Sequence, residues 1–122
     1  MKRYEGKRSY GQCFVTVNGR ALDPRFDLRF HSPDGFEWGY CGSGPAQLSL
    51  AILADHLVND EQALDFYQRF KWAVVAGLPK QRWTLTSQQI QEAVDTLRFA
   101  SALSASTPCG HARCEKGNNE TE

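Results

Sequence analysis

The segment Gly35–Leu57, GFEWGYCGSGPAQLSLAILADHL, joins a stretch rich in glycine and aromatic residues directly to a long apolar run. The three aromatic residues of the first part stand at alternate positions, which is typical of extended chain. Pro45 suits the first turn of a helix, where its missing N–H is not needed, and Ser43 or Gly44 can act as the N-cap. The segment therefore predicts extended chain, a sharp corner and a helix that begins near Pro45.

The predicted helix is apolar around most of its circumference. Between Ala46 and Val58 the apolar residues are interrupted mainly by four polar ones, Gln47, Ser49, Asp55 and His56. A surface helix would have one apolar stripe and one polar face, so this pattern indicates a helix that is buried on nearly all sides. We expect this helix to lie at the centre of the fold.

The sequence before this segment predicts strands. Cys13–Val17 is rich in β-branched and aromatic residues, and the Asn-Gly pair at 18–19 is a strong signal for a tight hairpin into Arg20–Leu22. Arg25–Phe30, RFDLRF, alternates apolar and charged residues and so predicts a half-buried strand. We expect Phe36–Tyr40 to continue in extended conformation.

Two further helices are expected after the segment. Asn59 and Gln62 have the spacing of a capping box, and apolar residues then recur at helical spacing until Gly77. Thr86 and Gln89 repeat the capping-box spacing ahead of a third helical pattern that continues to about residue 103.

This order of elements predicts an α+β fold, with a small antiparallel sheet of three or four strands packed on one face by about three helices. Trp83–Leu85 is expected to be a short extended piece. We expect residues 1–103 to form a single domain, because a chain of 122 residues usually carries one core. Residues 104–122 contain few large apolar side chains, so we expect them to form a flexible polar tail.

The composition disfavours several classes of function. The 14 Lys and Arg residues balance 14 Asp and Glu residues, so no global charge would attract nucleic acid or an anionic membrane surface. The sequence contains neither the apolar run of a signal peptide nor a stretch of about 18 apolar residues that would span a membrane. We therefore expect a soluble, cytoplasmic protein without membrane contact.

The stretch HSPDGFEWGYCGSGPAQLSLAILADHL, together with FYQRFKWAVVAGLP and WTLT further on, resembles a family of short uncharacterised proteins from bacterial, archaeal, plasmid and phage genomes. The family is known as a domain of unknown function. The resemblance covers about Arg3 to Arg98, and the family typically has glycine where this chain has Cys41. It implies no activity, but it favours an accessory protein of a phage or mobile element, of the host-interaction or anti-defence type.

The corner between the extended chain and the central helix is the predicted contact surface. Aromatic rings, free backbone N–H groups and the helix start meet there, and this combination suits binding. The predicted contact residues are Phe36, Glu37, Trp38, Tyr40, Gly42, Ser43 and Gln47. We expect a non-enzymatic module that uses this corner to bind another protein and needs no cofactor. If Trp38 and Tyr40 are buried, however, their role is structural and the site loses its main support.

Two other functions stay open at this stage. The helix start GSGP at 42–45 would hold a small anionic ligand through free N–H groups and the helix dipole, although it lacks the lysine of a phosphate loop. Basic residues near the start of the chain would bind nucleic acid beside two tyrosines. The basic residues are Lys2, Arg3, Lys7 and Arg8. Tyr4 lies between the two basic pairs, and Tyr10 follows the second pair. We expect this stretch instead to be an edge strand that its charges keep soluble.

Catalysis and metal binding have less support. The aromatic neighbours of Glu37 would raise its pKa toward that of a general acid, but alternation places its carboxylate on the opposite face, beside an arginine or solvent. Zinc would need ligands from the tail together with Cys13 or Cys41, and the spacing in the tail is not that of a structural zinc site. The tail ligands would be Cys109, His111 and Cys114. We therefore predict no catalytic residue and no metal site.

Overall fold

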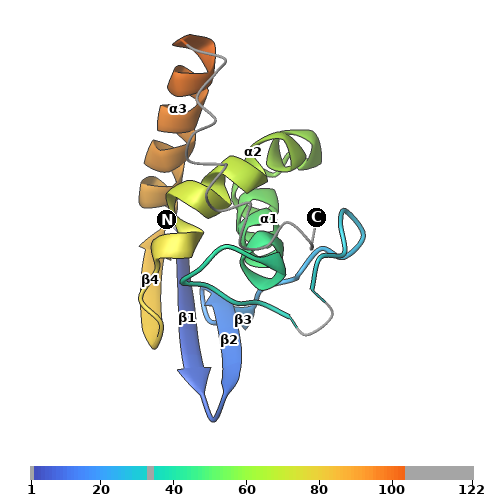
Figure 1. Cartoon of the computed structure of the whole chain (residues 1–122), viewed down its shortest axis with the longest axis vertical. Coiled ribbons are helices and arrows are strands. Elements are labelled where there is room, and N and C mark those ends of the chain that lie inside the picture. Colours follow the sequence, from blue (N-terminus) through green and yellow to red (C-terminus); the bar gives the residue numbers. More distant parts are fainter. Residues whose placement is uncertain (1, 33–34, 104–122) are drawn as a thin grey trace.

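The computed structural model describes residues 2–32 and 35–103, and its four strands form one antiparallel sheet in the order β3-β2-β1-β4. The strands are β1 (Arg3–Ser9), β2 (Gln12–Val17), β3 (Arg20–Ala21) and β4 (Arg82–Thr86). The helices are α1 (Ser43–Leu57), α2 (Asp60–Ala73) and α3 (Ser87–Leu103), with a short 3-10 helix, η1 (Val75–Gly77), after α2. The predicted α+β fold is confirmed (Figure 1).

β1 is a central strand, so the expectation of an edge strand at the start of the chain is wrong. It pairs with β2 on one side and with β4 on the other. The predicted hairpin at residues 18–19 is confirmed and connects β2 to β3. β4 follows α1 and α2 in the sequence and covers the edge of β1 that the hairpins leave open.

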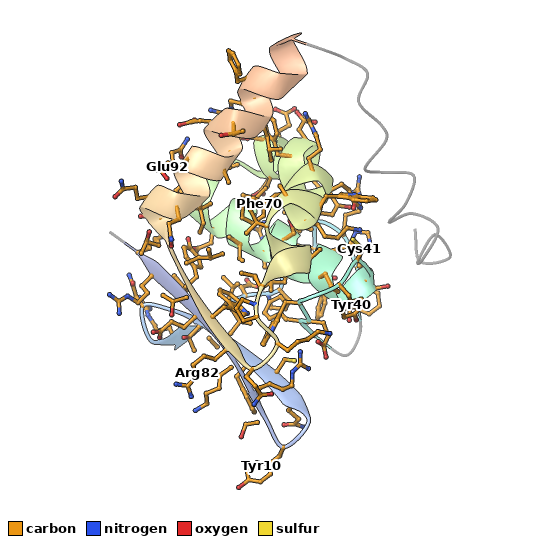
Figure 2. The ribbon with its side chains drawn as sticks, turned by 60° about the vertical axis from the view of Figure 1, so that its left-hand side comes forward. Tyr10, Tyr40, Cys41, Phe70, Arg82 and Glu92 are labelled. Carbon is orange, nitrogen blue, oxygen red and sulfur yellow. The ribbon has the colours of Figure 1, made fainter. Side chains whose placement is uncertain are left out.

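α1 lies at the centre of the core, as its apolar circumference predicts. All residues from Gly44 to Ala54 are buried. The same core cluster contains Tyr4 and Trp83 from the sheet and Phe70 from α2, which points into the interior (Figure 2). The helix begins with Gly42 as its N-cap, slightly earlier than predicted, and no side chain makes a capping hydrogen bond there.

The two predicted capping boxes mark real helix starts. At α2, Asn59 Oδ1 accepts a hydrogen bond of 3.0 Å from the backbone N–H of Gln62. At α3 the box is reciprocal, because Gln89 N donates to Thr86 Oγ1 at 3.2 Å and Thr86 N donates to Gln89 Oε1 at 2.9 Å. Local sequence therefore determines both boundaries.

The predicted strand Arg25–Phe30 is wrong, because this segment is a turn without strand pairing. Arg25 has φ = 55° and its carbonyl accepts a hydrogen bond from Leu28 N at 3.0 Å. The buried side chain of Gln47 holds the segment and the residues after it. Its amide nitrogen donates to Pro24 O and Arg29 O, and its oxygen accepts from the backbone N–H groups of residues 31 and 32. The side chain of Gln47 thus satisfies backbone groups that strand pairing would otherwise have satisfied.

Phe36–Tyr40 is not a strand either. Gly39 has φ = 86° and donates its N–H to Val75 O at 3.0 Å, so the chain turns before α1. The turn also breaks the expected alternation of side chains. Trp38 is completely buried, whereas Tyr40 is 45% exposed.

Candidate functional site

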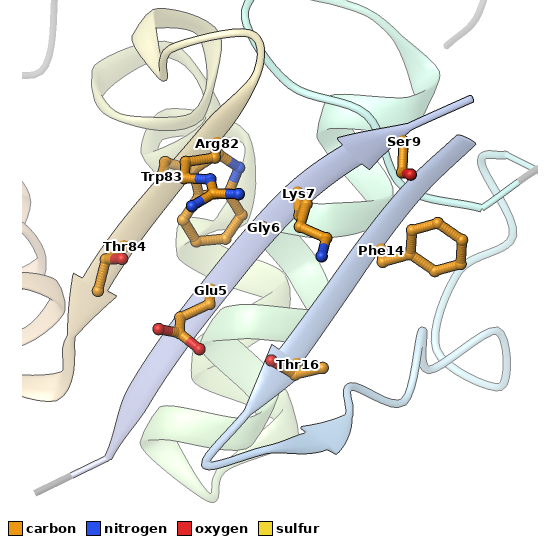
Figure 3. A pocket seen from close by; sticks show the side chains of 9 residues that line it. All are labelled: Glu5, Gly6, Lys7, Ser9, Phe14, Thr16, Arg82, Trp83 and Thr84. Carbon is orange, nitrogen blue, oxygen red and sulfur yellow. The ribbon is translucent and has the colours of Figure 1, made fainter. Parts of the chain in front are cut away.

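The sheet has one buried and one exposed face. Side chains of the inner face, among them Tyr4, Val15 and Trp83, are buried against the helices, which lie behind the sheet in Figure 3. The outward residues alternate with them along β1, β2 and β4. Exposed outward residues are Arg3, Glu5, Lys7, Gln12, Phe14, Arg82 and Thr84. No described residue therefore covers this outer face.

The outer face carries a cavity of about 540 Å³ that extends over β1, β2 and β4 (Figure 3). The residues that line it are Glu5, Gly6, Lys7, Ser9, Phe14, Thr16, Arg82, Trp83 and Thr84. Most of them are polar or charged, but Phe14 presents an aromatic ring that is 50% exposed. The cavity thus combines charge, hydrogen-bonding groups and an apolar surface.

Three side chains form a row across this cavity, which we name the cation–aromatic row (Arg82, Lys7 and Phe14). They are Cα partners on the adjacent strands β4, β1 and β2. Arg8 N donates to Gln81 O at 2.9 Å, so the neighbouring pair Lys7–Arg82 is of the non-hydrogen-bonded kind. Cα atoms in such pairs are only about 4.5 Å apart, and their side chains are close together. Two positive charges therefore stand side by side.

The charges of this row are not neutralised within the described part of the chain. Neither Lys7 nor Arg82 forms a salt bridge there. Glu5 is the nearest outward carboxylate on β1, but it pairs in register with Thr84 and Thr16, one row away. Like charges directly opposite each other destabilise a sheet, so the row has a cost to folding that the fold itself does not explain.

Other basic residues near the start of the chain have partners. Lys2 Nζ lies 3.0 Å from Asp55 Oδ2, and the same carboxylate oxygen accepts a hydrogen bond from the Tyr4 hydroxyl at 2.6 Å. Burial and this carboxylate together raise the pKa of Tyr4 well above its usual range. The residues of the predicted nucleic-acid patch are thus divided. Lys2, Tyr4 and Arg8 make contacts within the fold, whereas Lys7 belongs to the open face.

The predicted corner is held together from inside. Arg8 donates two hydrogen bonds to the Glu37 carboxylate, at 3.1 and 3.0 Å, and one to the Cys13 sulfur. Burial alone would raise the pKa of Glu37, but hydrogen bonds from Arg8 and Cys13 outweigh this effect and the pKa is lowered. Glu37 is therefore ionised at neutral pH. The sequence left an arginine or solvent open as its neighbour, and the structure places Arg8 there.

The aromatic residues of the corner have different environments. Trp38 is buried, makes a T-shaped contact with Trp83 at a centroid distance of 5.5 Å, and donates its Nε1–H to Lys80 O at 2.9 Å. Phe36 is half-buried against the core. Tyr40 alone is exposed, at 45%, and Lys80 Nζ lies 5.6 Å from the centre of its ring. The corner therefore offers one aromatic ring for contact, not three.

The polar residues at the start of α1 serve the fold. A Cβ atom on Gly44 would come within 2.5 Å of Glu37 Cβ, so only glycine allows the corner to pack this closely. Gly42 is buried and Ser43 is half-buried. The four hydrogen bonds of Gln47 use all the donors and acceptors of its amide, so contact with a ligand would require one of them to break.

The tail residues weighed as zinc ligands, Cys109, His111 and Cys114, lie outside the described residues. Within residues 2–32 and 35–103, no group of three or more His, Cys, Asp or Glu side chains is placed to hold a metal ion. Burial, followed by the hydrogen bond with Glu37, raises the pKa of the Cys13 thiol to about 11. Cys13 is therefore a neutral thiol at physiological pH and a poor nucleophile.

Comparison with known proteins identifies the family. A family model described as a family of unknown function (DUF6166) matches residues 4–96, which is most of the chain. The chain belongs to this family. No curated protein and no solved structure matches it. No helix in the described ranges is long and apolar enough to cross a membrane.

The match to DUF6166 includes both surfaces considered above. Residues 4–96 contain the cation–aromatic row on the sheet as well as the corner before α1. The family description carries no activity, so the choice between the two surfaces depends on their geometry. The corner has an internal partner for most of its groups, whereas the row has exposed groups without a partner among residues 2–32 and 35–103.

Sequence reasoning missed the cation–aromatic row. Alternation along Arg3–Ser9 and Arg82–Thr86 places Lys7 and Arg82 on the polar face of each strand. That signal was present, but it does not say that β1 and β4 are neighbours or in which register they pair. The contact between the two cations arises only from the tertiary fold.

Proposed function

We propose that this protein is a non-enzymatic binding module that recognises another macromolecule through the outer face of its sheet. The observation that carries the proposal is the uncovered face itself, with a cavity of about 540 Å³ and a half-exposed Phe14 ring on its β2 side (Figure 3). Exposed aromatic residues beside unpaired charges are typical of recognition surfaces. A role in a phage or mobile element, action in the cytoplasm and a protein as the partner stay predictions.

Site-specific photo-crosslinking in cells tests this proposal. The photoreactive amino acid p-benzoylphenylalanine replaces Phe14 or Thr84, which lie on the outer face, or Phe99, which is 66% exposed on α3. We expect both outer-face positions to give the same crosslinked macromolecule and Phe99 to give none. Equal labelling at all three positions, or none at Phe14 and Thr84, would overturn the proposal. Mass spectrometry and nuclease digestion then show whether the captured species is protein or nucleic acid.

A further inference from the structure

The cation–aromatic row has the chemistry of a nucleotide site. We propose that it binds single-stranded nucleic acid, with a backbone phosphate between Lys7 and Arg82 and a base stacked on Phe14. This inference rests on the proposed function of the outer face and names its partner. It differs from the basic patch considered in the sequence, because Lys2, Arg8 and Tyr4 take no part in it.

The phosphate position follows from the two cations. Lys7 and Arg82 face each other across a non-hydrogen-bonded pair, and no described carboxylate pairs with either. An anion between them would convert their repulsion into two attractive contacts. The planar guanidinium of Arg82 can donate two parallel hydrogen bonds to phosphate oxygens, and the Lys7 ammonium adds a point charge.

The base position follows from Phe14. Its ring is 50% exposed and its Cα is the register partner of Lys7. Neighbouring strands lie about 4.8 Å apart, so the ring and the two cations are within reach of one nucleotide. Aromatic rings on open sheets stack on unpaired bases whatever their sequence. A base inside a duplex is already stacked on its neighbours, which is why the site favours a single strand.

The row next to it supplies hydrogen-bonding groups for the base edges. Thr84, Glu5 and Thr16 are register partners across β4, β1 and β2, and all three line the same cavity. The hydroxyl groups donate or accept, and the carboxylate accepts from base amino groups. Glu5 also repels a second phosphate, so the strand should cross the sheet with its backbone over the row of Lys7 and Arg82.

An acidic peptide is the main competing occupant. Its carboxylates would use the charges of Lys7 and Arg82 but provide no flat ring to stack on Phe14. Nucleic acid uses all three side chains of the row, and for that reason the observations favour it. The two partners also differ in the test, because loss of the Phe14 ring should weaken binding of a peptide much less.

Fluorescence anisotropy with labelled oligonucleotides tests the proposal on the full chain. The probes are single-stranded DNA and RNA of about 12 nucleotides in mixed sequence, the matching duplex, and an acidic peptide. The variants are Lys7→Gln, Arg82→Gln and Phe14→Ala. Arg29→Gln is the matched control, since it removes an exposed cation whose side chain bonds, among the described residues, only to the adjacent carbonyl of Leu28. Circular dichroism confirms that each variant is folded.

We expect the wild-type protein to bind single strands more tightly than the duplex, with an affinity that falls as salt rises. Lys7→Gln and Arg82→Gln should each weaken binding. Because the two cations share one phosphate, the slope of log K against log salt should fall by at most about 0.7, the value for one phosphate contact with a single strand. Phe14→Ala should weaken binding about tenfold and leave the slope unchanged. Arg29→Gln should change neither the affinity nor the slope.

No binding of single strands at about 50 mM salt, tighter binding of the duplex, or equal competition by a free mononucleotide would overturn the nucleic-acid assignment. Preferential binding of the acidic peptide would do so as well. Each of these results leaves the crosslinking test of the outer face unaffected. If Phe14 and Thr84 still crosslink to a protein, the proposed function stands and only its partner changes.

Discussion

The Arg8–Glu37 ion pair is the contact at the residue scale that fixes the corner before α1. Glu37 accepts two hydrogen bonds from Arg8, and its side chain is 33% exposed. We expect Glu37→Gln to lower the free energy of unfolding by about 1–2 kcal/mol at pH 7, because one partner of a charged, bidentate contact is removed. Urea denaturation measures the loss.

The pH dependence of this loss has a definite sign. Because the folded-state pKa of Glu37 is lowered from its ordinary value of 4.5, the pair stabilises the protein above that value. Its contribution disappears as the pH falls through the folded-state pKa. The free energies of unfolding of wild type and Glu37→Gln should therefore become equal in acid. Glu92→Gln, at an exposed site on α3 (Figure 2), is the control and should change neither stability nor its acid dependence. A difference in the free energy of unfolding between wild type and Glu37→Gln that stays the same at all pH values would contradict this account.

The two tryptophans in T-shaped contact, Trp38 and Trp83, should respond differently to the same substitution. Trp38 Nε1 donates to Lys80 O, whereas Trp83 Nε1 is buried without a hydrogen-bond acceptor in the described residues. Trp38→Phe loses ring volume and a hydrogen bond, but Trp83→Phe loses ring volume and an unsatisfied donor. We expect Trp38→Phe to be the more destabilising by about 1 kcal/mol in urea denaturation. An equal or larger loss for Trp83→Phe would show that the indole of Trp83 has a partner.

At the scale of elements, the first hairpin carries an unusual turn residue. Tyr10 has φ = 51° and Gly11 has φ = 77°, almost the conformation of Asn18 (50°) and Gly19 (85°) in the second hairpin. Asparagine tolerates this left-handed conformation better than tyrosine does. Tyr10 is fully exposed at the hairpin tip (Figure 2), so its ring contributes no packing to offset the cost.

We therefore expect Tyr10→Asn to raise the free energy of unfolding by about 0.5–1 kcal/mol. The reverse change in the second hairpin, Asn18→Tyr, should lower it, and by more, because Asn18 Oδ1 also accepts a hydrogen bond from Arg3 N. Thermal and urea denaturation of the two single variants measure both effects. If Tyr10→Asn destabilises the protein, the tyrosine ring packs in solution against β1 or β2.

The elements that the sequence predicted correctly are those whose signals are local. The caps at Asn59 and Thr86 act within three residues, and the apolar circumference of α1 reports burial whichever neighbours surround it. Arg25–Phe30 has an equally clear two-residue period, yet it forms a turn because Gln47 binds its backbone from another element. Periodicity does not detect a distant side chain that replaces the partner strand.

The candidate site follows the same division. Sequence reasoning left an arginine or solvent open as the neighbour of Glu37, and only the fold brings Arg8 to it. It did not separate Trp38, which is buried, from Tyr40, which is exposed, because the turn at Gly39 depends on a hydrogen bond to Val75. The cation–aromatic row needs the strand order as well, and no local pattern contains that order.

At the scale of the whole molecule, a balanced total charge hides an uneven distribution. The chain has a formal net charge of zero. On the outer face, however, the exposed charged residues of β1 and β4 are three cations and one carboxylate, an excess of two positive charges (3 − 1 = 2). These residues are Arg3, Lys7, Arg82 and Glu5. The composition argument against nucleic acid considered only the total and so could not detect this local field.

This distribution predicts opposite effects of one substitution on folding and on binding. Arg82→Glu places a carboxylate directly opposite Lys7, so a repulsive cross-strand pair becomes an attractive one. We expect the unliganded variant to be more stable than wild type by about 0.5 kcal/mol at low salt, and this gain should shrink as salt screens the pair. Thermal unfolding at two salt concentrations measures the gain.

The same variant should fail to bind. A single-stranded oligonucleotide at about 100 times its Kd should stabilise wild type by about 2.7 kcal/mol, because it binds only the folded state. Arg82→Glu should show no such shift at the same concentration, although the variant alone is the more stable protein. Higher stability together with lost binding separates the two roles of Arg82. A change that merely damaged the fold would lower both the stability of the unliganded protein and its stabilisation by the oligonucleotide. If Arg82→Glu destabilises the unliganded protein, the two cations do not repel each other and the reason for placing a phosphate between them is lost.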